Sequence, residues 1–293
     1  VWHKNANQKT LHWKKKTKMI DEAPPELQIL QDVLNEIGRA AIAVSGGVDS
    51  MTLAIVAGRL PGNEIEVFHA LSPAVPADAS VRVRQHAEQE AWRLHEINAG
   101  EFDDPKYRDN PINRCFYCKS NLYGTIASHT TETVLSGTNL DDLGDYRPGL
   151  EAAHRHSVRH PFVEAEIDKD TVRAIARHLA LDDLAELPAA PCLSSRVETG
   201  LRIEGNQLTL IDAVEKFIRR RLGADTVRCR IRRKEVIIEL GEEELEALSK
   251  KDRGELRTVI SAMFEADGIA KPLDFRPYRM GSAFLRRAAA ANG

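Results

Sequence analysis

A short loop with two glycines is the first segment whose residue types and spacing could do chemistry. Residues 45–50 (SGGVDS) lie between an apolar run and a helical pattern. Glycine lets a backbone approach a ligand closely, and the N–H groups that begin a helix attract anions. Ser45 and Ser50 add hydroxyl donors, and Asp49 suits Mg²⁺ held beside phosphates. Because the loop lacks the lysine of a Walker A motif, it predicts a different kind of phosphate site.

Cysteines form a second set of chemically capable residues. Cys115 and Cys118 make a Cys-x-x-Cys pair, Cys192 follows later, and Cys229 alternates with arginines in an expected strand. In a reducing compartment such a pair suits metal binding or catalysis better than a disulfide. It could be half of a zinc site or a redox pair, whereas three thiolates on a [4Fe–4S] cluster would leave one iron open to sulfide. We expect Cys229 to be a core residue.

The surroundings of Cys192 favour reactivity. Pro191 disfavours helix for the residue before it, so we expect Cys192 on an exposed loop. Arg196 would favour the reactive thiolate if its side chain folded back. The candidate catalytic residues are therefore Cys192, Asp49 and Arg196, and a buried, inert Cys192 is the alternative.

The elements that must position these residues alternate between helix and strand. The expected helices are 26–38, 51–60, 81–95, 120–129 and 168–181, and the expected strands are 40–45, 64–72, 95–102 and 132–139. Asp168 at the start of the last helix is its expected cap. This alternation predicts an α/β fold, in which a parallel sheet is covered by helices on both faces. Such sheets bind ligands at the carboxyl ends of their strands. The segments expected to meet there are 45–50, 69–73 and 137–142.

We expect three parts along the chain. They are a basic, disordered extension at 1–22, a phosphate-binding α/β domain at 23–200 and a small α+β domain at 201–293. Within the last part the pattern predicts a helix at 206–223, a hairpin at 226–240 and a mostly helical segment at 242–268. Arg228, Arg230 and Arg232 fall on one face of the first strand of that hairpin. They could clamp a phosphate or form a solvated charged face.

Four segments together carry a resemblance to a known family. The loop SGGVDS resembles the PP-loop of the ATP pyrophosphatases, which split ATP between its α and β phosphates. The other three segments are NRCFYCKSNLY (113–123), SGTNLDDLGDYRPGL (136–150) and PCLSSRVETG (191–200). The set looks like the LarE family of ATP-dependent sulfur transferases, which build the nickel-pincer cofactor of lactate racemase. The resemblance covers about residues 26–285, and the sequence departs from it in the basic stretch 1–20 and the His-rich stretch 154–160.

The resemblance implies a mechanism and its cofactors. With ATP and Mg²⁺, the family adenylylates a carboxylate of a nicotinate-derived (pyridinium) mononucleotide, and a sulfur nucleophile then converts it to a thiocarboxylate. In one branch a cysteine matching Cys192 gives up its own sulfur and ends as dehydroalanine. In the other branch three cysteines hold a [4Fe–4S] cluster that carries sulfide. Because Cys115, Cys118 and Cys192 are all present, we favour the cluster branch.

The resemblance also assigns binding residues. Those expected to contact ATP are Ser45, Gly46, Gly47, Asp49, Ser50, Ala70, Gly137, Thr138 and Asn139. Among them, Asp49 is also the expected Mg²⁺ ligand, and Ala70 belongs to the segment 68–73, which is expected to lie against adenine. Asp141 and Asp142 are further candidates for ATP or Mg²⁺, unless they belong to a solvated turn. The residues expected to contact the mononucleotide are Asp145, Arg147, Arg228 and Arg230.

Bulk properties limit the partners. The net charge is −3, and we find no run of about 18 apolar residues. We therefore expect a cytoplasmic protein that binds neither membrane nor nucleic acid. The resemblance implies a homo-oligomer, a small mononucleotide substrate, and other cofactor-biosynthesis proteins as partners.

Three alternative functions stay open. A tRNA thiolase would bind RNA in a salt-dependent way. An amide-forming synthetase would use ammonia and need no cysteines. A nucleotide sensor would bind ATP without releasing pyrophosphate.

Overall fold

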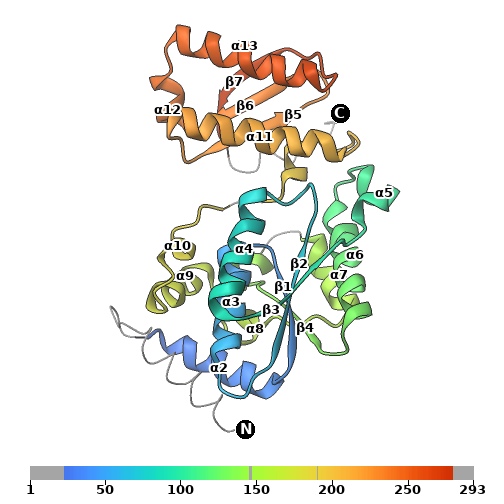
Figure 1. The fold of residues 1–293 in the computed structure, drawn as a ribbon, viewed down its shortest axis with the longest axis vertical. Helices are drawn as coiled ribbons and strands as arrows, with labels where there is room; N and C mark the ends of the chain where they lie inside the picture. Colours follow the sequence, from blue (N-terminus) through green and yellow to red (C-terminus); the bar gives the residue numbers. More distant parts are fainter. Residues whose placement is uncertain (1–22, 145–146, 190, 280–293) are drawn as a thin grey trace, which may run out of the picture. The chain divides into compact units, whose positions relative to one another are not determined.

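The computed structural model describes residues 23–144, 147–189 and 191–279 (Figure 1). The chain divides into two compact units. The first comprises Val1–Glu101 and Cys115–Ala190, and the second comprises Phe102–Arg114 and Pro191–Gly293. The basic extension expected at 1–22 and the candidate residue Asp145 lie outside the described residues.

The first unit is built on a parallel sheet of four strands in the order β3-β2-β1-β4. The strands are β1 Ala40–Val44, β2 Ile65–Ala70, β3 Arg93–Ile97 and β4 Thr133–Ser136. The register pairs Ala43 of β1 with Phe68 on one side and Ser136 on the other. The strands therefore end at a common edge, and the predicted α/β fold with a parallel sheet is confirmed.

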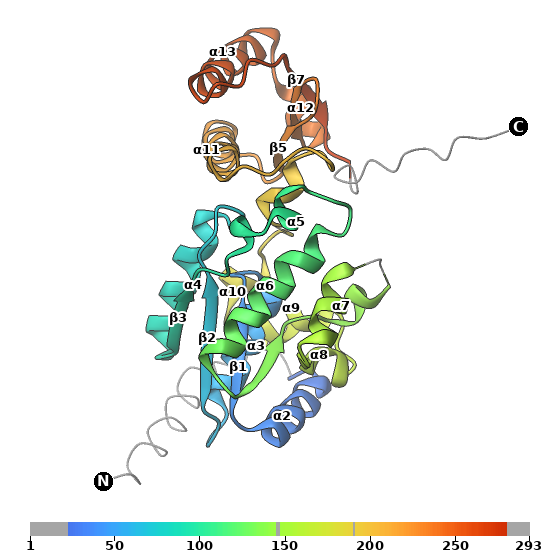
Figure 2. The same ribbon diagram turned by 90° about the vertical axis from the view of Figure 1, so that its right-hand side faces the viewer.

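Helices cover both faces of this sheet (Figure 2). They are α2 Pro25–Ile37, α3 Val48–Arg59, α4 Ala77–Glu90, α6 Arg114–His129, α7 Pro148–Arg155, α8 Pro161–Glu164, α9 Lys169–His178 and α10 Asp182–Ala185, with 3₁₀ turns η1 Glu101–Asp103 and η2 Leu140–Leu143.

Strand β1 is buried on both faces because successive side chains point to opposite sides of a sheet. Ile42 and Val44 belong to the core that contains α2, α3 and α9. Ala41 and Ala43 belong to the core that contains residues of α6 and α7. A strand covered on both sides has a continuous apolar sequence, as AAIAV has.

Helix α6 begins earlier than the expected residue 120. No glycine or proline lies between Arg114 and residue 120, and Arg114 N donates to Pro111 O at 3.0 Å. The helix therefore extends back to the turn that follows Pro111, and Cys115 and Cys118 lie on a helix.

The second unit carries a three-stranded sheet in the order β5-β6-β7. Its elements are α5 Pro105–Arg108, η3 Leu193–Arg196, α11 Gly205–Leu222, β5 Val227–Ile231, β6 Val236–Leu240, α12 Glu242–Ala247, α13 Lys250–Ala266 and β7 Leu273–Pro277. Strands β5 and β6 form the predicted antiparallel hairpin, whereas β7 pairs in parallel with β6 and was not predicted. The segment expected to be mostly helical contains two helices, because Ser249 Oγ accepts from Asp252 N and starts α13 anew.

The predicted core position of Cys229 is confirmed, since its side chain is fully buried. Among the helices that the structure describes, none is both long enough and apolar enough to cross a membrane.

Two isoleucines test the placement of β1. Ile42 on β1 is fully buried, and Ile29 on α2 is 49% exposed. We expect Ile42→Ala to lower the free energy of unfolding by about 2–5 kcal/mol, because it leaves a cavity. The matched Ile29→Ala should change it by less than about 0.5 kcal/mol. Urea titrations followed by circular dichroism measure both values, and equal losses would contradict the core position of Ile42.

Candidate functional site

The glycine loop connects β1 to α3, as its sequence predicts. Gly47 immediately precedes α3, whose leading N–H groups have no partner within the helix. Ser45 N donates to Ser50 Oγ at 3.0 Å, and the Ser50 hydroxyl donates to Gly47 O at 3.3 Å. The two serine hydroxyls are 3.2 Å apart. The serine side chains therefore brace the loop, and the backbone at the start of α3 provides the anion-binding group.

Gly46 sits where only glycine fits. Its φ is +78°, and a Cβ there would lie 2.7 Å from Ala79 O in the first turn of α4. Arg82 Nη1 donates to Gly46 O at 2.7 Å. The loop is thus packed directly against α4.

A second close approach joins the loop after β4 to the start of α3. A Cβ on Gly137 would lie 2.6 Å from Ser50 N, so only a glycine lets the two backbones come this close. Next to it, the Ser136 hydroxyl is 3.1 Å from Thr138 Oγ1 and 2.8 Å from His160 Nδ1. The segments expected to meet at this edge, 45–50 and 137–142, do meet.

Asp49 is held from two directions at the start of α3. Asn139 Nδ2 donates to Asp49 Oδ1 at 3.0 Å, and Lys169 Nζ forms an ion pair with Asp49 Oδ2. Lys169 is the first residue of α9, after Asp168, whose side chain accepts from Thr171 N at 2.8 Å. The sequence predicts the Asp168 cap, but no local pattern indicates that Lys169 reaches the loop.

The two adjacent carboxylates after Asn139 each have cationic or backbone partners. Asp141 Oδ2 accepts from Lys169 N at 2.9 Å. Asp142 Oδ2 accepts from Asn139 N at 3.3 Å, and its Oδ1 lies 2.9 Å from Arg147 Nη1. These contacts fix the turn, and Arg147, a candidate substrate residue, lies at its end.

The end of β2 is fixed through a buried histidine. His69 Nδ1 lies 3.0 Å from Val44 O, and Nε2 lies 2.8 Å from the Ser80 hydroxyl. Burial lowers the pKa of His69, while the Val44 hydrogen bond opposes that shift. The ring is therefore neutral near pH 7, with its proton on Nδ1. It holds β1, β2 and α4 together beside half-buried Ala70, the residue predicted near adenine.

Cys115 and Cys118 lie on helix α6 in the first unit, and both are half-buried. Their three-residue spacing puts them on one face of the helix. Cys192 belongs to the second unit. Within the described ranges, no three His, Cys, Asp or Glu side chains are grouped so that they could hold a metal ion. The three-cysteine cluster therefore has no support from the structure.

Cys192 is exposed on a backbone that is firmly anchored. The next five residues, 193–197, are buried. Buried Arg196 pairs with Glu215 at 2.9 Å and donates from Nη1 to Pro191 O at 3.0 Å. Burial alone would raise the pKa of Glu215, but Arg196 and the N–H of Cys229 hold it below its ordinary value. Arg196 thus positions the backbone next to the thiol and is paired with Glu215.

Arg228 and Arg230 share one face of β5, as their alternation predicts, and both are buried. Arg230 Nε pairs with Glu239 at 2.7 Å, and its Nη1 donates to Ser195 O at 3.1 Å. The Arg228 guanidinium lies 5.6 Å from the centre of the Tyr278 ring. Their predicted contact with substrate stays a prediction.

The residues of the loop fit a magnesium ion. Mg²⁺ in nucleotide sites is commonly held by one or two carboxylates together with substrate phosphates. Asp49 supplies a carboxylate beside the amide-lined start of α3, and its side chain is 25% exposed. Asp49 is therefore the residue that would hold the ion.

Two glycines separate the effects of backbone conformation and packing. Gly46 and Gly62 both have positive φ, but a Cβ on Gly62 would meet nothing within 4 Å. Gly62→Ala should cost only the left-handed strain of about 1–2 kcal/mol. Gly46→Ala should cost about 1–3 kcal/mol more through its clash with α4, and should weaken ATP binding. Urea titration and calorimetry measure these effects, and equal destabilisation would contradict the close packing of the loop on α4.

The buried histidines make stability depend on pH. Burial lowers the pKa of His69 and His160 below the ordinary 6.5. The unfolded chain therefore binds more protons than the fold below about pH 6.5, and the free energy of unfolding should fall as the pH falls. His69→Gln should reduce this slope between pH 7 and 5, as urea titrations at each pH measure. An unaltered slope in His69→Gln would show that His69 is not held neutral.

Several proteins are similar in sequence, although no family model matches the chain. The uncharacterized Synechocystis protein slr1717 is 36% identical over 225 residues, which cover 75% of this chain and 83% of that protein. The pyridinium-3,5-bisthiocarboxylic acid mononucleotide synthase of Lactiplantibacillus plantarum is 28% identical over 214 residues, which cover 71% of this chain and 77% of the synthase. One of the subunits of the glutamine-hydrolyzing GMP synthase of Methanopyrus kandleri is 28% identical over 185 residues, which cover 57% of this chain and 56% of that subunit. This chain belongs to the family of the Synechocystis protein, and its similarity to the synthase and to the GMP synthase subunit makes it LarE-like and of the PP-loop class.

Proposed function

We propose that this chain is an ATP-dependent sulfur transferase that acts on a pyridinium mononucleotide. It adenylylates a carboxylate of the nicotinate-derived substrate and replaces an oxygen with sulfur, as the name of the L. plantarum relative suggests. One observation carries the proposal: Asn139 and Lys169 hold the carboxylate of Asp49 at the amide-lined start of α3.

The first step makes the carboxylate reactive. A carboxylate is a poor acyl donor because oxide is a poor leaving group. A substrate oxygen bonds to the α-phosphorus of ATP, and diphosphate departs with the electrons of the broken P–O bond. The N–H groups at the start of α3 stabilise the charge that develops on diphosphate. Mg²⁺, when bound at Asp49, would neutralise part of the same charge. The Lys169 ammonium is a further positive charge beside it.

The second step needs a sulfur nucleophile, and Cys192 has the required exposure. Its thiolate bonds to the acyl carbon of the adenylate, and AMP leaves with the electrons of the C–O bond. The exposed thiol stands on a backbone that Arg196 fixes through Pro191 O. Arg196 acts as a positioning residue in this proposal.

The sulfur can come from one of two sources. If it is the sulfur of Cys192 itself, the Cα proton and the Cβ–S bond are lost, and dehydroalanine remains. The alternative that the cysteine count favours is sulfide held through Cys115, Cys118 and Cys192, so that Cys192 survives turnover. An iron and sulfide assay on anaerobically purified protein, together with the mass of the Cys192 peptide after turnover, tells the two sources apart.

The wider setting follows from the same proposal. The thiolated mononucleotide would supply the nickel-pincer cofactor of lactate racemase, with other cofactor-biosynthesis proteins as partners. The chain would act as a homo-oligomer in the cytoplasm.

Two substitutions test the two steps with ATP and pyridinium-3,5-biscarboxylic acid mononucleotide. Asp49→Asn should slow pyrophosphate release by about 100-fold or more, because the carboxylate that would hold Mg²⁺ beside the leaving diphosphate is lost. The matched control Asp32→Asn, at an exposed site on α2, should keep the full rate. Cys192→Ser should still release pyrophosphate in a first turnover but form no thiocarboxylate, as measured by mass spectrometry.

Three outcomes would contradict the proposal. A full rate in Asp49→Asn would remove the loop from catalysis. Normal thiocarboxylate formation in Cys192→Ser would exclude Cys192 as the sulfur nucleophile. An amide product formed with ammonia would favour the synthetase alternative, which the similarity to GMP synthase keeps in view.

A further inference from the structure

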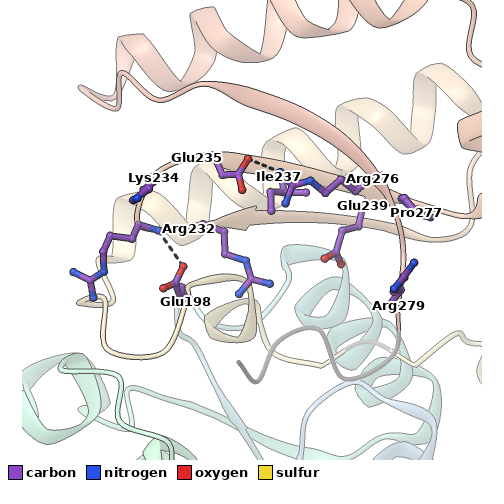
Figure 3. Close-up of a pocket in the computed structure, with 10 residues that line it drawn as sticks. Glu198, Arg232, Lys234, Glu235, Ile237, Glu239, Arg276, Pro277 and Arg279 are labelled. Carbon is purple, nitrogen blue, oxygen red and sulfur yellow. Dashed lines mark hydrogen bonds and ion pairs between the residues drawn. The ribbon is translucent and has the colours of Figure 1, made fainter. Parts of the chain in front are cut away.

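A cavity of about 590 Å³ lies in the second unit, over the sheet formed by β5, β6 and β7 (Figure 3). Two of its carboxylates already have partners, because Glu239 pairs with an arginine of β5 at 2.7 Å and Glu198 accepts from Arg233 N at 3.1 Å. Lys234 and Arg279, two of its cations, flank opposite ends of the parallel β6–β7 pair. These side chains therefore do not converge on one ligand.

A short chain of polar side chains at the end of β4, in the first unit, has one open end. The Ser136 hydroxyl lies 2.8 Å from His160 Nδ1 and 3.1 Å from Thr138 Oγ1. Ser136 is buried, whereas His160 and Thr138 are half-buried. Within the described part of the chain, the Thr138 hydroxyl has no hydrogen-bond partner besides Ser136. The chain His160–Ser136–Thr138 can therefore form one more hydrogen bond at Thr138.

Thr138 lies beside the amide-lined start of α3. Gly137, its neighbour on one side, approaches α3 so closely that a Cβ would lie 2.6 Å from Ser50 N. Asn139, its neighbour on the other side, donates to the Asp49 carboxylate at 3.0 Å. Because both neighbours touch the first turn of α3, Thr138 is held next to the N–H groups that suit phosphates.

His160 reaches Ser136 from a fixed backbone. The preceding residue, Arg159, donates from N to Val134 O at 2.9 Å, and its carbonyl oxygen accepts from Ser136 N at 3.1 Å. These bonds pair the segment before α8 with β4, which is an outer strand of the sheet. On the other side, His160 O accepts from Glu164 N at 3.0 Å. The ring is thus placed by both β4 and α8.

The hydrogen bonds along this chain have a direction. A hydroxyl has one proton to donate, and an ionised phosphate oxygen can only accept. If Thr138 donates to a phosphate, Ser136 must donate to Thr138, and Ser136 then has no proton left for the ring. His160 Nδ1 must in that case carry a proton and donate to Ser136. A ring with its proton on Nε2 alone favours the opposite direction, in which Thr138 donates to Ser136.

The position of one ring proton therefore decides what Thr138 can do. Burial lowers the pKa of His160, while the nearby carboxylates of Glu164 and Asp142 oppose that shift. The ring is neutral near pH 7 and has a single proton, on Nδ1 or on Nε2. An anion that accepts from Thr138 selects the Nδ1 position.

We propose that His160 is a positioning residue of the nucleotide site, which donates through Ser136 and so directs the Thr138 hydroxyl toward a phosphate oxygen of ATP. The choice of an ATP phosphate as the acceptor rests on the proposed function. His160 ends the His-rich stretch 154–160, where the sequence departs from its resemblance to the LarE family. This role accounts for one histidine of that stretch.

The position of the ring proton can be observed directly in the full chain. NMR spectra of the histidine ring nitrogens distinguish a protonated Nδ1 from an unprotonated one, and the signals of His160 are those missing in His160→Asn. With Mg²⁺ and α,β-methylene ATP, an analogue that cannot release pyrophosphate, Nδ1 of His160 should be protonated. An unprotonated Nδ1 in this complex would overturn the proposal.

Variants at residue 160 test the effect on binding of the same analogue, measured by calorimetry. Leucine and asparagine are similar in size, but only asparagine offers an N–H donor near the place of Nδ1. His160→Leu should weaken binding by about three- to tenfold, the usual loss for one hydrogen bond, and His160→Asn should stay within about twofold of the wild type. The matched control His154→Leu, at an exposed position on α7, should bind as the wild type does. Melting curves check that each variant folds.

A second background tests whether His160 acts through Ser136. In Ser136→Ala the link between the ring and Thr138 is absent, so adding His160→Leu should weaken binding no further. A full additional loss in the double variant would overturn the proposal. So would wild-type affinity in His160→Leu, or an affinity of His160→Asn as low as that of His160→Leu.

Failure of the proposed function is read separately. A wild-type protein that forms thiocarboxylate, with His160→Leu binding the analogue at wild-type affinity, keeps the sulfur-transfer proposal and refutes the role of His160. A protein that shows the expected ring proton and binding pattern but forms no thiocarboxylate supports the role of His160 and refutes the sulfur-transfer proposal.

Discussion

The first unit depends on holding one carboxylate, Asp49, at the start of a buried helix. Most of α3 is buried in the core, so its first turn cannot shift to suit a ligand. Asn139 and Lys169 reach the carboxylate from the loop after β4 and from the start of α9. The backbone at Gly137 fits against the same turn without room for a Cβ. Sheet pairing, helix packing and the charge at the loop are therefore coupled, and a change in one disturbs the others.

Local sequence signals found the parts of this arrangement but not all of its contacts. Burial on both faces gives β1 its continuous apolar run, and glycines mark 45–50. The Asp168 cap was also visible, because capping is a local hydrogen bond. The contact of Lys169 with Asp49 could not be predicted, because the two residues are 120 apart in the sequence and meet only once α9 packs beside α3. Strand β7 was missed because it is short, follows Pro272 and ends at Pro277, and prolines are uncommon in strands.

In the second unit, too, local sequence patterns predict which face a side chain lies on but not its partners. The alternation of Arg228 and Arg230 with apolar residues correctly placed them on one face, but their partners come from elsewhere in the chain. The segment 102–114 joins this unit through hydrogen bonds that no local pattern encodes. Asn110 Nδ2 donates to Glu198 O at 2.9 Å, and Gly200 N donates to Asn110 O at 2.9 Å. A boundary near 200 follows from composition, whereas these pairings follow from tertiary structure.

The role of Arg196 follows from what a buried ion pair can and cannot do. Taking Arg196 and Glu215 out of water is costly, and their mutual attraction offsets this only if the remaining donors and acceptors are satisfied. Both side chains have such further partners. Arg196 also donates to Pro191 O, and Glu215 also accepts from Cys229 N. A guanidinium committed in this way has its charge matched by Glu215, which leaves little of it to stabilise a thiolate. Its effect on Cys192 is therefore mechanical, because it fixes the backbone on one side of an exposed thiol. That is what a nucleophile requires when it must be reachable by a bound substrate and still keep a defined position.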